Sequence, residues 1–240
     1  MLVDKLRPYV KICVPCYDVK TWMESVGKAS YDTMVMQRET SKEVLPFDFT
    51  YGFCQGTVIE QSRNALIQPD LSAQAVRQKL DAPFSHYLFL DHDVAWSVND
   101  LLKLLADNKP IVSGCYRPKH QTDIYVAGYY DEHCRIQSHV LVSDTGKGLI
   151  KVGWVGGGFL LVTKEALEKM TYPWFWKTVH YYSNRALCVG EDIFFCKNAE
   201  NNLLDVWLDT DVVLNHEANR NSVSKEHRKH AGISDPIIVA

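Results

Sequence analysis

The sequence lacks the segments that direct a chain into or across a membrane. Its first ten residues carry Asp4, Lys5 and Arg7 where a secretory leader would be apolar, so no signal peptide is visible. No uncharged apolar run approaches the roughly 18 residues that a membrane-spanning helix requires. We therefore expect a soluble, cytoplasmic protein with no membrane span.

The sequence also lacks a clustered, even set of cysteines and a surplus of positive charge. Its seven cysteines are scattered, mostly within apolar stretches, which is typical of free thiols in a reducing compartment. Cys13 and Cys16 form a CxxC, but no second CxxC is present to complete a zinc site. The net charge of −3 argues against broad nucleic-acid binding, which usually needs a basic surface.

Short apolar runs alternate with helical segments along the 240 residues. The segment Tyr17–Thr50 is expected to be irregular with one short helix, and Gln121–Thr145 is expected to form a hairpin. The alternation predicts a single α/β domain with a mostly parallel central sheet and helices on both faces. The predicted strands include Val10–Pro15, Ser85–Leu90, Pro110–Cys115 and Val206–Asn215. The predicted helices lie within Gly56–Gln68, Leu101–Ala106, Lys164–Met170 and Glu191–Asn201.

The clearest chemical signal is the run LFLDHDV, residues 88–94. Alternation along the strand places Asp91 and Asp93 on one side, just past its carboxyl end, where α/β sheets bind ligands. Two carboxylates at this spacing repel each other unless a cation lies between them. Hard divalent ions prefer oxygen ligands and keep positions open for phosphate oxygens. A DxD also occurs by chance in loops where each Asp caps a backbone amide, so the other motifs decide.

Four segments occur in the order found in GT-A-fold glycosyltransferases. YLFLDHDVAWSVNDLLKLLADNKPIVSGCY resembles the metal-binding core of that family, and VIEQSRNALIQ is similar to the helix whose Arg-Asn faces the nucleotide. VGWVGGGFLLVTKEALEKM resembles the Gly-rich acceptor-side strand and helix. VGEDIFFCKNAENNLLDVWLDTDVVLNHE resembles the ED-motif helix and the strand that delivers a metal-binding His. The departures are His92 between the aspartates and the unfamiliar stretch Gln121–Thr145.

The match covers roughly residues 10 to 220 and is closest in character to small bacterial and phage transferases. For a viral protein, the expected location would be the host cytoplasm. The resemblance implies a single GT-A-type, Rossmann-like domain over residues 1–240. It implies a nucleotide-binding half at about residues 10–118 and an acceptor and catalytic half at about residues 119–240.

The resemblance implies a metal site formed by Asp91, Asp93 and His216. Asp93 is the expected direct ligand, and Asp91 is expected to reach the metal through water or to hold the ribose. His216 follows an apolar strand; alone it would be read as a structural residue, but beside two aspartates a neutral imidazole is a sensible third ligand. A mixed Asp/His set favours Mn²⁺ or Mg²⁺ over zinc.

Glu191 and Asp192 open a predicted helix after Gly190. Acids at this position commonly just complement the helix dipole. The resemblance implies a catalytic pair, in which Asp192 is the general base that takes a proton from an acceptor hydroxyl and Glu191 orients the acceptor or its loop. A base of this kind implies direct displacement with inversion at the anomeric carbon.

Further residues are expected to bind the donor nucleotide and sugar. Arg63 and Asn64 form the Arg-Asn of the second motif, and the glycine run permits a close backbone approach to the donor sugar. The end of the first strand lies where the family places the base, on which Tyr17 could stack. A basic tail segment could fold over the diphosphate, although it is most simply a solvated tail. The donor-binding residues are then Pro15, Cys16, Tyr17, Arg63, Asn64, Asp91, Gly157, Gly158 and Arg228.

The first hypothesis is an inverting, metal-dependent glycosyltransferase with a nucleotide-sugar donor, most simply a UDP-sugar. A nucleotidyltransferase that forms activated sugars shares the sheet and the metal, but VPCYDVK offers no Gly-rich loop with a basic residue after the first strand. A non-catalytic nucleotide-sugar-binding module is the third possibility. The acceptor stays open among a glycan, a lipid-linked sugar, a protein and a hydroxymethylated base of phage DNA, which would have to be flipped out of a duplex.

Overall fold

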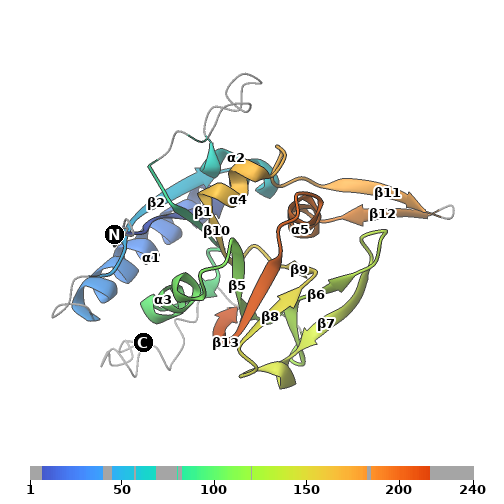
Figure 1. Ribbon diagram of the computed structural model, residues 1–240. Helices are drawn as coiled ribbons and strands as arrows, with labels where there is room; N and C mark the ends of the chain where they lie inside the picture. Colours follow the sequence, from blue (N-terminus) through green and yellow to red (C-terminus); the bar gives the residue numbers. More distant parts are fainter. Residues whose placement is uncertain are drawn as a thin grey trace, which may run out of the picture.

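The computed structural model describes residues 7–39, 45–56, 58–68, 80, 83–119, 121–182 and 185–216. These residues form a central sheet with helices on both faces, a smaller three-stranded sheet and a projecting two-stranded ribbon (Figure 1). No helix among them is both long and apolar enough to cross a membrane. All seven cysteines fall within the described segments as free thiols.

The central sheet contains eight strands, and most of them run in one direction. The order is β2 (Asp48–Gln55), β1 (Tyr9–Cys16), β3 (His86–Leu90), β10 (Phe159–Thr163), β5 (Ile111–Tyr116), β13 (Val206–His216) and β4 (Val94–Ala95), and β8 (Leu149–Val152) also pairs with β13. β1 is parallel to β2 and β3, and β5 is parallel to β13. Because β10 is antiparallel to both β3 and β5, these five strands all run in the same direction. The predicted mostly parallel α/β sheet is therefore confirmed, with β10 as a reversed strand in its middle.

Alternate side chains of the buried strands supply two hydrophobic layers. In β3, Tyr87 and Phe89 pack into one layer, whereas Leu88 and Leu90 pack into the other. The first layer contains residues of α2 (Ile59–Ile67), α4 (Lys164–Lys169) and α5 (Glu191–Asn201). The second layer contains residues of α3 (Val98–Asp107). This two-sided burial explains why β3 reads as a continuous apolar run instead of an alternating one.

Helix α1 (Val19–Glu39) corrects the expectation of an irregular segment at Tyr17–Thr50. It is 21 residues long, and its buried positions include Thr21, Ser25 and Ala29. These residues are spaced four apart and so share one helix face, but they are small or polar and give no apolar periodicity to read. The same segment also contains the beginning of β2, an aromatic-rich strand that pairs with β1.

The remaining strands build structure beside the central sheet. The expected hairpin at Gln121–Thr145 is confirmed, because β6 (Ile124–Tyr130) and β7 (Ile136–Leu141) pair antiparallel, with a short 3₁₀ turn, η2 (Val142–Asp144), after them. β9 (Trp154–Val155) joins β6 to complete the smaller sheet. The ribbon of β11 (Thr178–Tyr182) and β12 (Arg185–Val189) projects from the molecule just before α5 (Figure 1) and was not predicted.

Candidate functional site

The acidic residues of the two main motifs meet at one edge of the central sheet. Asp91 and Asp93 follow the carboxyl end of β3, and His216 ends β13. Glu191 and Asp192 form the first turn of α5. Because β3 and β13 run in the same direction, their carboxyl ends lie at the same edge, where open α/β sheets bind ligands.

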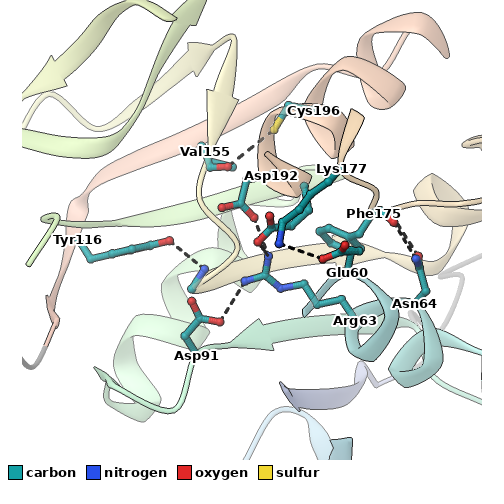
Figure 2. A network of polar contacts seen from close by, with 12 residues as sticks. Glu60, Arg63, Asn64, Asp91, Tyr116, Val155, Phe175, Lys177, Asp192 and Cys196 are labelled. Atoms are coloured by element: carbon teal, nitrogen blue, oxygen red, sulfur yellow. Dashed lines mark hydrogen bonds and ion pairs between the residues drawn. The ribbon is translucent and has the colours of Figure 1, made fainter. Parts of the chain in front are cut away.

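The guanidinium of Arg63 joins the two acidic motifs (Figure 2). Its Nη2 donates to Asp91 Oδ1 at 3.0 Å, and its Nη1 donates to Asp192 Oδ1 at 2.7 Å and to Glu191 Oε1 at 3.3 Å. The Arg63 side chain is 2% exposed, whereas Asp91 and Asp192 keep 25% and 27% of their side-chain surface open. The two carboxylates are thus held by a buried cation and still reach solvent.

This arrangement shifts the proton affinities of its members. Burial raises the pKa of Asp192; the positive charge of Arg63 opposes that rise, the negative charges of Glu191 and Asp91 add to it, and the resulting pKa is about 6. Burial alone would lower the pKa of Arg63, but the three carboxylates raise it above its ordinary value. Arg63 therefore stays charged, and Asp192 is a carboxylate whose pKa lies near the range useful for a general base.

The three consecutive glycines make room for Arg63 and for the hydroxyl of Tyr116. A Cβ on Gly157 would lie 2.6 Å from Arg63 Cζ, and a Cβ on Gly156 would lie 2.1 Å from the Tyr116 hydroxyl oxygen. The Gly158 amide donates to that hydroxyl at 2.9 Å, and the Gly158 carbonyl accepts from the Asp91 amide at 3.0 Å. The glycine run is thus closely approached by the protein's own Arg63 and Tyr116 side chains.

Asn64 fixes the loop that precedes the projecting ribbon. Its Nδ2 donates to the Phe175 carbonyl at 2.7 Å, and its Oδ1 accepts from the Phe175 amide at 3.1 Å. The Phe175 ring in turn packs against the Arg63 guanidinium at 5.4 Å. Asn64 is 2% exposed. Arg63 and Asn64 are both buried and bonded to other parts of the protein, so in this structure they position the site.

A second cluster lies around Asp93. Its Oδ1 is 3.4 Å from His216 Nε2, and its Oδ2 accepts from Lys119 Nζ at 2.6 Å. His216 Nδ1 lies 2.9 Å from the Arg117 carbonyl oxygen. Burial raises the pKa of Asp93, but hydrogen bonds from His216 and Lys119 outweigh it and hold that pKa well below its usual range. The hydrogen bond with Asp93 raises the pKa of His216.

Asp93 and His216 offer an oxygen and a nitrogen of the kinds that divalent ions accept as ligands. The Arg117 carbonyl at Nδ1 keeps a proton there when the ring is neutral. The Nε2 atom, which donates to Asp93 while it is protonated, would then have a lone pair for a metal, the usual arrangement for a metal-binding His. Within the described part of the chain, no group of three His, Cys, Asp or Glu side chains is arranged to hold a metal. Mg²⁺ and similar ions commonly use one or two protein ligands and fill the rest with water and substrate phosphates, so Asp93 and His216 fit this mode.

The end of β1 lies beside the two acidic clusters. Pro15 and Cys16 are buried within the strand, and Tyr17 is 45% exposed just beyond it. The Tyr17 ring meets the His92 ring edge to face at 6.0 Å. Burial, and then the charge of Asp91, raise the pKa of Tyr17. An exposed aromatic ring therefore stands beside the two aspartates, while Pro15 and Cys16 offer mainly backbone.

The structure thus brings together most of the site residues expected from the sequence. Asp91, Asp192 and Glu191 share Arg63, and Asp93 pairs with His216, so Asp91 belongs to a different cluster from the other two proposed metal ligands. Arg228 lies outside the described residues. Sequence reasoning missed Tyr116 and Lys119. Tyr116 is the last residue of β5 and Lys119 follows it closely, and the carboxyl end of β5 lies near those of β3 and β13.

Comparisons with known proteins give similarities of fold at low identity. No protein-family model and no curated protein matches the sequence. The structure is similar to that of GalNAc-T7 with UDP, GalNAc and Mn²⁺, with a TM-score of 0.48, 12% identity and coverage of 89% of this chain and 44% of that chain. It is also similar to A197 from STIV, with a TM-score of 0.43, 14% identity and coverage of 88% and 82%. A third similar structure is that of the inositol-1-phosphate CTP transferase from T. maritima, with a TM-score of 0.38, 9% identity and coverage of 95% of this chain and 95% of that chain.

Proposed function

We propose that this chain is an inverting, metal-dependent glycosyltransferase that moves a sugar from a nucleotide-sugar donor, a UDP-sugar, to an acceptor hydroxyl. The observation that carries the proposal is the contact of Arg63 with both Asp91 and Asp192. It couples a carboxylate from the DxD run at the end of β3 to a carboxylate with a raised pKa at the start of α5. Glycosyl transfer needs a cation for the leaving diphosphate and a base for the acceptor within one site.

The charges of the site support a cationic cofactor. Its ion pairs join four carboxylates, those of Asp91, Asp93, Glu191 and Asp192, to the two permanent cations Arg63 and Lys119. The excess negative charge would be balanced by one divalent ion. In this proposal Asp93 and His216 would hold Mn²⁺ or Mg²⁺, and Asp91 would reach it through water or hold the ribose. Bound there, the ion would supply positive charge for the departing diphosphate.

The chain's own groups then divide the work of the reaction. Asp192 Oδ accepts the proton of the acceptor hydroxyl while that oxygen attacks the anomeric carbon from the face opposite the diphosphate. The bond from the anomeric carbon to the diphosphate oxygen breaks, and its electron pair leaves with the diphosphate. Arg63 holds Asp192 in place, Glu191 orients the acceptor or its loop, and the exposed Tyr17 ring stacks on the nucleotide base. In this proposal the half from about residue 10 to 118 binds the nucleotide, and the half from about residue 119 to 240 binds the acceptor and supplies the base.

A binding experiment tests the proposal before the acceptor is known. Thermal unfolding is followed with a panel of nucleotides and nucleotide sugars, with and without Mn²⁺. A ligand at a hundredfold excess over its dissociation constant stabilises the folded protein by roughly 2.7 kcal/mol. We expect a Mn²⁺-dependent stabilisation by UDP and its sugars. The absence of any Mn²⁺-dependent nucleotide binding would reject the proposed function.

The metal assignment is tested by Asp93→Asn, which preserves shape and removes charge. Calorimetry with UDP and Mn²⁺ should show loss of the metal-dependent binding with the fold intact. Asp205→Asn is the matched control, because Asp205 also pairs with one lysine, Lys151, at 2.7 Å, but at the opposite end of β13. Undiminished binding by Asp93→Asn would remove the metal assignment.

A further inference from the structure

Lys119 forms an ion pair with one carboxylate oxygen of Asp93, the proposed metal ligand. Its Nζ lies 2.6 Å from Asp93 Oδ2, while the other oxygen, Oδ1, faces His216 at 3.4 Å. The Asp93 side chain is 14% exposed and the Lys119 side chain is 42% exposed. The carboxylate is thus enclosed by two partners, one of which is a flexible, half-exposed ammonium that can leave.

The segment after β5 positions the two side chains that contact Asp93, those of His216 and Lys119. The Arg117 carbonyl fixes the His216 ring through Nδ1, and two residues later Lys119 reaches Asp93. Pro118 stiffens the backbone between them, and its carbonyl accepts from the Gln121 amide at 3.3 Å, which closes a turn. Lys119 therefore reaches Asp93 from a braced backbone, and only its four-carbon stem has to move for the ammonium to change partners.

An ammonium and a divalent ion cannot share the same carboxylate oxygen without strong repulsion. A metal ion that binds Asp93 must therefore displace Lys119 or accept the weaker position on Oδ1 alone. The displaced ammonium would remain near Asp93, within reach of the oxygens of a diphosphate that the ion would bind. A lysine ammonium is a common phosphate partner that acts as a point charge.

We propose that Lys119 is an exchangeable cation: it neutralises Asp93 in the free protein and moves onto the donor's diphosphate when the metal and the nucleotide bind together. The inference rests on the proposed function, since it assumes that Asp93 binds the metal. It gives Lys119 two opposite effects. Lys119 competes with the metal when no nucleotide is present, and it strengthens nucleotide binding once the metal is bound.

The test uses Lys119→Met, which keeps the length of the side chain and removes its charge. Binding of Mn²⁺ alone, followed through the electron paramagnetic resonance signal of the free ion, should become tighter by about threefold, as expected for the loss of a partly exposed ion pair. Binding of UDP at saturating Mn²⁺, followed by calorimetry, should become weaker by about tenfold, as expected for the loss of a charged phosphate contact. Uridine, which has no diphosphate, should bind the variant and the wild type equally.

Two further variants serve as controls. Lys119→Arg restores a cation and should return both affinities toward the wild-type values. Lys151→Met removes a lysine that pairs with Asp205 at 2.7 Å and is remote from the site, so it should change neither affinity. Thermal unfolding of each variant without ligand shows whether it folds.

The two opposite changes are required together. If Lys119→Met weakens Mn²⁺ binding, or leaves UDP binding unchanged, Lys119 is only a structural partner of Asp93 and the proposal is overturned. The wild-type protein separates this result from failure of the proposed function. If wild-type protein binds no UDP in the presence of Mn²⁺, the transferase assignment falls, and the exchange falls with it.

Discussion

Arg63 Nη1 and Asp192 Oδ1 lie 2.7 Å apart, although the two residues are 129 positions apart in the sequence. The contact joins α2, beside β1, to the first turn of α5, and the same guanidinium also reaches Asp91. A buried charge with several partners holds those partners firmly, because breaking the contacts would leave it uncompensated. The relative positions of the proposed base and of the DxD run are therefore set before any ligand binds.

The glycine opposite Arg63 gives the first prediction. In Gly157→Ala the new Cβ would lie 2.6 Å from Arg63 Cζ and 2.7 Å from both Nη atoms. The guanidinium cannot move freely, because three carboxylates hold it. We expect a loss of about 1–3 kcal/mol in the free energy of unfolding, the usual range for overpacking, measured by urea denaturation.

Gly27→Ala is the matched control for that variant. Gly27 lies inside α1, and a Cβ there would meet nothing within 4 Å. Because glycine is a poor helix former, this change should add about 0.5–1 kcal/mol of stability. If Gly157→Ala is as stable as the wild type, Arg63 is free to shift, and the positions of Asp91 and Asp192 are not fixed by it.

The sheet and the acidic motifs could be predicted from the sequence, because both depend on local patterns. The apolar run at Ser85–Leu90 predicts a buried strand, and alternation then places Asp91 and Asp93 at its carboxyl end. Glycine at position 190 followed by two acids predicts a helix start, which the structure confirms as α5. These expectations needed no knowledge of which strands are neighbours.

The contacts that build the site depend on the tertiary fold and could not be predicted in this way. Arg63 reads as one polar residue on a short helix, and only the approach of α5 and of the glycine run shows that its charge is enclosed. Lys119 follows β5, and its contact with Asp93 requires β5 to lie near β3 and β13 in the sheet. Helix α1 buries small residues, so its sequence has no apolar stripe.

The second prediction concerns the pH dependence of metal binding. A histidine must be neutral to bind a metal ion. The hydrogen bond with Asp93 raises the pKa of His216 above its ordinary value. Protons therefore compete with the metal at pH values below that raised pKa. The affinity for Mn²⁺ should fall as the pH is lowered from 8 toward 6, approaching about tenfold per pH unit for one proton displaced.

The variant His216→Ala tests the origin of this pH dependence. It should bind Mn²⁺ more weakly at pH 8 and lose most of the change between pH 8 and 6, while still folding. His133→Ala, which alters a histidine paired with Glu132 at the surface, should behave as the wild type. Equal affinity and equal pH dependence in His216→Ala and the wild type would make His216 a structural residue.

The last prediction concerns Asp192 and tests the chemical step instead of binding. A general base acts in the transition state, so its removal should lower turnover and spare the ground-state complex. We expect Asp192→Asn to lose transfer by about 10² to 10⁴, the usual contribution of positioned proton transfer, and to bind UDP and Mn²⁺ nearly as the wild type does. Glu191→Gln should lose less, because Glu191 only shares Arg63 with the base.

Because the pKa of Asp192 is raised to about 6, wild-type turnover should fall as the pH drops through 6, and Asp192→Asn should lack that fall. Single-turnover transfer, donor affinity and the anomeric configuration of the product by NMR are the measurements. Near-wild-type turnover in Asp192→Asn, or a product that keeps the donor's configuration, would reject both the base and the inverting mechanism.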